Sequence, residues 1–135
     1  GISVVKEALI ANHTANIHAM HDPTEGGLAT GLFELARVSD TGIIIYAEKV
    51  KHREEVRILC SEYELDPMGV IASGALLIVV DPDDREAVLS KLVQNNIECS
   101  VIGRLTDKED GLKIIVDGES RDLPLFEVDE ITRVI

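Results

Sequence analysis

Apolar residues along the chain follow two spacings, the alternation typical of strands and the period of about 3.6 residues that marks amphipathic helices. Short apolar runs predict strands at 15–20, 43–46, 75–80, 98–104 and 112–116. Helical spacing predicts helices at 23–38, 52–64 and 83–95, with a short helical turn over 66–72. We expect the tail, 123–135, to fold back as a short helix or strand. This order predicts an α+β fold in which helices pack on a mixed, largely antiparallel sheet.

The same pattern predicts which residues are buried. The continuous apolar run 75–80 is typical of a strand buried on both faces. The helix at 23–38 is expected to bury Leu28, Leu32, Leu35 and Ala36. The other two helices are expected to turn inward Val56, Leu59, Cys60, Tyr63, Ala87, Val88, the stem of Lys91, and Leu92. Chain length is sufficient for one domain, 1–135, with its own core.

Charge and composition narrow the functional classes. The chain has 13 basic and 25 acidic side chains, a formal net charge of −12, which argues against nucleic acid or a membrane surface as partner. No apolar run approaches the roughly 20 residues of a spanning helix, and no signal peptide is visible. The two cysteines, Cys60 and Cys99, lack paired spacing and are expected to be reduced thiols of a cytoplasmic protein. Because the chain starts at Gly1 rather than at methionine, we expect it to be part of a longer protein.

The segment 21–27, His-Asp-Pro-Thr-Glu-Gly-Gly, lies where a predicted strand ends and a helix begins. Asp22 as N-cap, Pro23 in the first turn and Glu25 in a capping box would explain most of it without a ligand. Gly26 and Gly27 need another reason, because each glycine costs a helix roughly 1 kcal/mol relative to alanine. Open backbone amides at the helix start would bind an anion, assisted by a metal ion because the domain is acidic. The alternative is tight packing of helix against sheet.

Histidines are the candidates for proton transfer or metal binding. His21 is the one beside the glycine turn, and it could equally serve only to hydrogen-bond the loop. Strand alternation places His21 and Ile17 on one face and His18 and Met20 on the other. His13, His18 and His21 are therefore not expected to converge, and no metal ligand is assigned.

A weaker candidate precedes the strand at 75–80. Ala72-Ser73-Gly74 places a glycine at the strand entry, where it can mark a close approach of backbone. An ordinary turn is the favoured interpretation of this pattern.

Three blocks of the chain resemble one family. Residues 21–36, HDPTEGGLATGLFELA, are similar to the C-terminal domain of the AIR synthase (PurM-like) superfamily, and most similar to its HypE branch of hydrogenase expression/formation proteins. Residues 65–80 resemble a second block, and Gly103-Arg104 within VIGRL a third. The first block is fairly specific for HypE, whereas the other two are shared more widely. The resemblance implies the α/β/α layers of that domain.

The resemblance also implies a two-domain, ATP-using enzyme of which this chain is the second domain. A missing N-terminal domain would supply most of the Mg²⁺-binding carboxylates and the dimer interface, so the isolated domain is not expected to be active. HypE proteins use ATP to dehydrate a carbamoyl group on a C-terminal cysteine, which yields the thiocyanate for hydrogenase cyanide ligands. Cofactors would be ATP and Mg²⁺, and partners would include hydrogenase-assembly proteins.

Site residues follow from the same resemblance. His21 would contact the reacting group, and Asp22 would fix the loop or make Mg²⁺-linked contacts. The cofactor-facing residues would be Thr24, Gly26, Gly27, Ser73 and Gly74.

Two departures keep alternatives open. Residues 129–135 contain no cysteine, and Glu25 stands where the family often has a basic residue. A related kinase or synthetase with another small acceptor is one alternative. A non-catalytic assembly module, whose negative charge attracts basic partners, is another.

Overall fold

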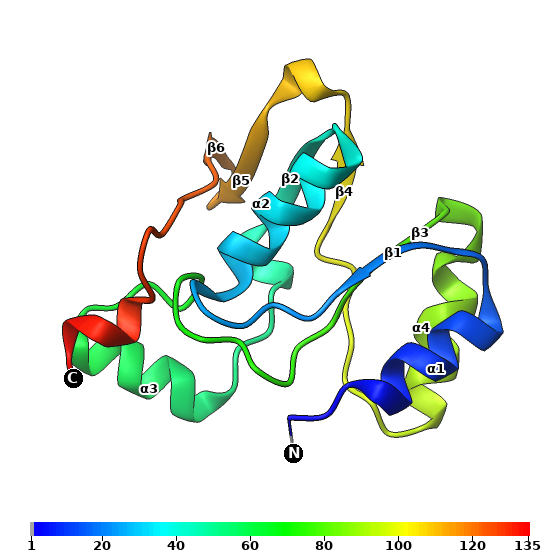
Figure 1. Ribbon diagram of the computed structural model, residues 1–135, viewed down its shortest axis with the longest axis horizontal. Coiled ribbons are helices and arrows are strands. Elements are labelled where there is room, and N and C mark those ends of the chain that lie inside the picture. Colours follow the sequence, from blue (N-terminus) through cyan, green and yellow to red (C-terminus); the bar gives the residue numbers. More distant parts are fainter. Residues whose placement is uncertain (1) are drawn as a thin grey trace.

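The computed structural model describes residues 2–135 and arranges them in two layered parts (Figure 1). The helices are α1 (Val5–Thr14), α2 (Gly27–Ser39), α3 (Glu54–Tyr63) and α4 (Arg85–Gln94). The strands are β1 (Ile17–His21), β2 (Gly42–Tyr46), β3 (Leu77–Val80), β4 (Gly103–Thr106), β5 (Leu112–Val116) and β6 (Glu119–Asp122). Four short 3-10 turns, η1 (Ala47–Lys49), η2 (Pro82–Asp84), η3 (Lys108–Asp110) and η4 (Glu130–Arg133), complete the elements. The predicted α+β class is confirmed.

The larger part is a four-stranded mixed sheet covered by α2. Its strand order is β4-β2-β5-β6, with β2 parallel to β5 and the other pairs antiparallel. Leu32 and Ala36 of α2 pack against Ile43 and Ile45 of β2 and Ile114 of β5, all nearly inaccessible to solvent. This apolar layer fixes the axis of α2 and, with it, the position of the loop that precedes the helix (Figure 1).

The smaller part joins the antiparallel pair β1 and β3 to α1 and α4. A register shift between Ile17 and Ala19 interrupts the alternation of β1. Ile17 and Met20 consequently pack into the same core, beside Val88, so the predicted opposite facing of these two residues is wrong. Among the described residues, 2–135, no helix is long and apolar enough to cross a bilayer.

Several predicted boundaries and faces differ from the structure. The strand at 75–80 starts at Leu77, and only Leu77 is fully buried, because a two-stranded sheet covers little of its neighbour. The strand expected at 98–104 begins only at Gly103, and 66–72 forms turns without a helix. Tyr63 is half exposed and Ala87 and Lys91 are exposed, whereas Leu28 is partly buried.

Two elements were not predicted. The apolar residues of α1 do not form one stripe, since Val5 and Leu9 are exposed while Ala11 is buried. Every residue of β6 is exposed, and the strand forms because Asp117 and Gly118, both at positive φ, turn the chain back along β5. Neither element has a hydrophobic period that sequence inspection could detect.

The tail was predicted to fold back as a short helix or strand, and it folds back against α3 as the 3-10 turn η4. Ile131 and Val134 pack on the cluster formed by Cys60, Leu65 and Val70. The Glu130 carboxylate accepts a hydrogen bond of 3.0 Å from the backbone N–H of Asp66. This contact holds the last residues beside the segment that follows α3.

Candidate functional site

The loop between β1 and α2 is shaped by two glycines in left-handed backbone conformations. Gly26 has φ of 74° and Gly27 has φ of 68°, a region that other residues adopt only with strain. A regular helix cannot extend back beyond this pair, so α2 begins at Gly27 with Gly26 as its N-cap. The expected helix start at Asp22-Pro23, with Glu25 in a capping box, is therefore wrong. Pro23 is instead fully buried beneath α2.

Gly27 allows a close crossing of two backbone segments. A β-carbon at this position would lie 2.5 Å from the carbonyl oxygen of Met68 and 2.7 Å from that of Val70. The Met68 carbonyl also accepts a hydrogen bond of 2.9 Å from the N–H of Ala29, in the first turn of α2. Tight backbone packing, the alternative to an anion site in the sequence analysis, therefore explains the glycine at position 27.

The amide of Gly26 is occupied from within the chain. Its N–H donates to Oδ2 of Asp129 at 2.9 Å, and the other carboxylate oxygen accepts from the N–H of Ile131 at 3.0 Å. Asp129 is only 8% exposed. The N–H of Gly27 donates to the Thr24 carbonyl at 3.2 Å. The amides of Gly26 and Gly27 were expected to be open but are both paired, and the anion at the start of α2 is a carboxylate of the tail.

The outer side of the same loop faces solvent. Asp22, Thr24 and Glu25 are exposed. The Thr24 carbonyl also accepts from the N–H of Ala72 at 3.1 Å, which ties the loop to the turn that carries the exposed Ser73 and Gly74. The structure therefore brings Thr24 and the Ser73-Gly74 turn together on one exposed rim.

His21 is bound to a residue that sequence reasoning missed. Its Nε2 lies 2.7 Å from Oε2 of Glu34, on the outward side of α2. The His21 side chain is 30% exposed, so the ring is accessible to solvent or a ligand. Glu34 carries no local signal, because only the packing of α2 over the end of β1 brings it to His21.

His13 and His18 contact different groups. The His18 ring reaches Asp81 at 3.0 Å, and Nδ1 of His13 contacts the Leu9 carbonyl at 2.7 Å. Within residues 2–135, no group of three or more His, Cys, Asp or Glu side chains is arranged to hold a metal.

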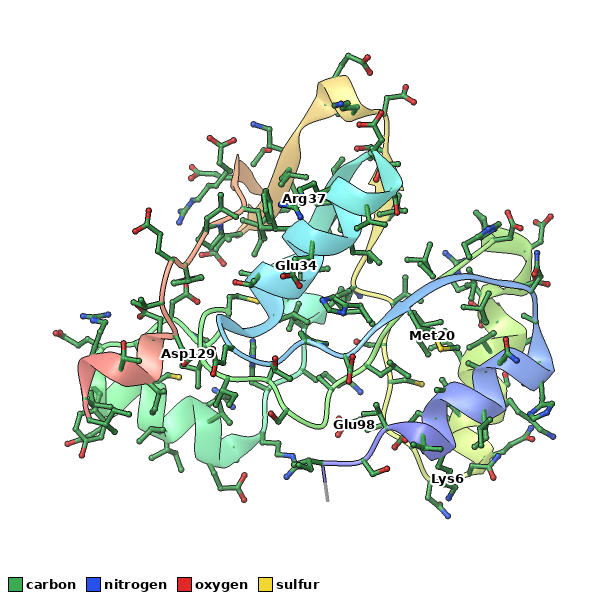
Figure 2. The ribbon with its side chains drawn as sticks, in the orientation of Figure 1. Lys6, Met20, Glu34, Arg37, Glu98 and Asp129 are labelled. Atoms are coloured by element: carbon green, nitrogen blue, oxygen red, sulfur yellow. The ribbon has the colours of Figure 1, made fainter. Side chains whose placement is uncertain are left out.

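A shallow groove of about 200 Å³ adjoins the His21–Glu34 pair. Its walls come from α2 and from the tail at 125–127, with the phenyl rings of Phe33 and Phe126 supplying apolar surface. Glu34 and Arg37 both line it and lie along the same stretch of α2 (Figure 2). The groove thus combines a carboxylate, a guanidinium and an apolar wall, and the His21 imidazole contacts that carboxylate.

Comparison with known sequences gives one consistent relationship. The C-terminal domain of AIR synthase related proteins matches residues 3–115. A hydrogenase expression/formation protein of Methanocaldococcus jannaschii is 35% identical over 122 residues, which cover 87% of this chain and 36% of that protein. The carbamoyl dehydratase HypE of Rhizobium leguminosarum is 35% identical over 99 residues, 72% of this chain and 28% of that protein. The chain therefore spans about a third of these relatives or less.

Solved structures agree with this relationship. Escherichia coli HypE superposes with a TM-score of 0.84 over 98% of this chain and 42% of its own, at 23% identity, which shows the shared fold. A HypE structure in complex with ATP gives a TM-score of 0.75 at 31% identity, over 84% of this chain and 37% of its own. The predicted resemblance to the HypE branch is confirmed.

Proposed function

The chain belongs to the family of AIR synthase related proteins, as their C-terminal domain, and from this premise we propose that it serves an ATP-dependent, HypE-like hydrogenase maturation factor. The observation that carries the proposal is the 35% identity to a hydrogenase expression/formation protein over 87% of the chain. The 31% identity to a HypE that binds ATP supports the same nucleotide for this protein.

The proposed reaction is the dehydration of a carbamoyl group. Bound ATP would supply the phosphoryl group that converts the amide oxygen into a leaving group. The residues of this chain would then position the reacting group and exchange a proton at Nδ1 of His21, while Glu34 orients the ring by holding Nε2 at 2.7 Å.

The rim is suited to the edge of a nucleotide rather than to the whole of it. Asp22, Thr24 and Ser73 offer oxygen ligands and hydroxyl groups on one exposed surface, and Gly74 leaves room beside them. Arg37 is the cation that lines the adjacent groove. One guanidinium cannot neutralise a triphosphate, so Mg²⁺ and a preceding N-terminal domain would supply most of the phosphate contacts.

In this proposal the two loop glycines act indirectly. Gly26 and Gly27 would hold Thr24 and Asp22 toward the nucleotide, because their left-handed conformations and the Asp129 carboxylate fix the loop. We further propose a homodimer in the cytoplasm. A solved HypE–HypF complex, whose HypE is 26% identical to this chain with a TM-score of 0.75, supports a hydrogenase-assembly protein as partner.

A chimera tests the proposal. The region of the Rhizobium leguminosarum carbamoyl dehydratase that matches this chain would be replaced by residues of this chain, while the relative keeps its own ends. We expect ATP-dependent phosphate release that depends on the carbamoylated acceptor. His21→Ala should lower the rate on the order of 10²-fold, as for loss of a general acid or base.

The matched control is Glu25→Gln, an exposed change in the same loop. It should leave the rate within about twofold, since no reacting role is assigned to this side chain. A folded chimera that binds its protein partner but releases no phosphate would contradict the enzymatic proposal and favour an assembly module.

A further inference from the structure

A second hollow, of about 490 Å³, lies where the two parts of the molecule meet. It is lined by β2, η1, the first turns of α4, the segment 100–101 and β4. Its lining residues are Tyr46, Lys49, Arg85, Glu86, Leu89, Ser100, Val101, Gly103 and Arg104. It shares no residue with the groove beside His21 or with the rim at Thr24.

The hollow concentrates positive charge in an acidic protein. Lys49, Arg85 and Arg104 line it together, although the chain carries a net charge of −12. Within the described chain, 2–135, neither Lys49 nor Arg104 has a carboxylate within 4.0 Å, and Arg85 has only its neighbour Glu86 at 3.5 Å. Both side chains of that pair are at least half exposed, so their interaction is weak.

The remaining lining groups suit an anionic organic ligand. Arg104 donates to the Tyr46 hydroxyl oxygen at 3.1 Å, which orients the guanidinium and leaves the hydroxyl hydrogen available to a ligand. β4 is an edge strand, so one side of its backbone has no strand partner. Leu89 and Val101 add apolar wall. A volume of several hundred Å³ is typical of small-molecule sites.

We propose that this hollow binds a small molecule bearing a diphosphate group, which Lys49, Arg85 and Arg104 contact. Ammonium and guanidinium groups that line one hollow, with only one weak ion pair among them, are the donors that phosphate oxygens require. The diphosphate belongs either to a nucleotide or to free pyrophosphate. The proposal rests on this hollow alone and does not depend on the carbamoyl chemistry.

Titration of the ¹⁵N-labelled chain with pyrophosphate and, separately, with ADP tests the proposal. We expect saturable amide shifts at Tyr46, Ser100 and Gly103. The double variant Lys49→Gln/Arg104→Gln should raise the dissociation constant by about tenfold or more, because two charge-assisted contacts are lost. Tighter binding of ADP with added shifts at Leu89 and Val101 identifies a nucleotide source, and equal binding identifies the free anion.

The matched control is Lys91→Gln/Arg53→Gln, which removes the same charge from exposed positions outside the hollow. It should leave both dissociation constants within about twofold, apart from the general loss of charge. Equal weakening in the control, shifts that do not saturate, or shifts only with an acidic peptide would overturn the proposal. Thermal unfolding of each variant verifies that the fold is retained.

Discussion

The Asp129 carboxylate accepts a hydrogen bond from the backbone N–H of Gly26, 103 positions away in the sequence, at 2.9 Å. Figure 2 places Asp129 next to the loop that precedes α2. The contact unites the tail with the start of the helix and fills the position where an anion was expected. A carboxylate at a helix N-terminus is favoured both by the unpaired amides and by the helix dipole.

Removal of this carboxylate should destabilise the fold. Asp129→Ala leaves the buried N–H of Gly26 and the partly buried N–H of Ile131 unpaired, and we expect a loss of about 1–3 kcal/mol in the free energy of unfolding. Asp129→Asn keeps one acceptor oxygen and should lose less. Urea unfolding measures both. Glu127→Gln, an exposed change in the same tail, is the control, and a midpoint for Asp129→Ala equal to that of this control would contradict the role of the contact.

Alanine substitutions at Gly27 and Gly118 distinguish the cost of steric overlap from the cost of backbone strain. Both have positive φ, but a β-carbon at Gly27 would meet carbonyl oxygens, whereas nothing lies within 4 Å at Gly118. Gly118→Ala should therefore cost only the conformational strain of about 1 kcal/mol. Gly27→Ala should cost about 3 kcal/mol or more, because the crossing backbone must also move. Similar thermal midpoints for the two variants would show that the crossing at Gly27 is loose.

The Glu130 carboxylate should make the free energy of unfolding depend on pH in the acidic range. The hydrogen bond from the Asp66 N–H lowers the pKa of Glu130 below its ordinary value of 4.5, and Arg133 lowers it further. Since the folded-state pKa is depressed, the stabilisation is present above about pH 4.5 and is lost as pH falls through the lowered pKa.

The variant Glu130→Gln should be less stable than the parent at neutral pH and should approach it on acidification. Urea midpoints measured across that range test this. Glu62→Gln, on the exposed side of α3, should show no such convergence. A difference that stays constant with pH would mean that the Glu130 charge contributes nothing.

Cys60 should resist alkylation in the folded protein. It is 4% exposed, and burial, with Asp66 and Glu130 nearby, raises the pKa of its thiol, so little reactive thiolate forms. Cys99, whose pKa is also raised by burial, is less enclosed and should react first. Iodoacetamide labelling followed by peptide mass analysis gives the order. Rapid native labelling of Cys60 would indicate that the tail opens away from α3.

The hydrophobic pattern was sufficient to predict an element wherever that element has its own regular apolar spacing. The β-branched run at 43–46 and the apolar run at 112–116 predicted β2 and β5, because a strand buried against α2 must present apolar residues. The helical spacing at 52–64 predicted α3 to within two residues. β6 could not be found in this way, since its residues are all exposed and only pairing with β5 forms it.

For the candidate site, the sequence by itself identified the segment 21–27 and the family it resembles. An unusual backbone conformation requires particular residues, such as paired glycines, and these are visible in the sequence. Tertiary structure alone decided that Gly26 meets Asp129, that His21 meets Glu34, and that Lys49, Arg85 and Arg104 share one hollow. These contacts join residues distant in the chain. Whether these contacts form depends on how the helices and strands pack together, and residue spacing along the chain cannot predict that packing.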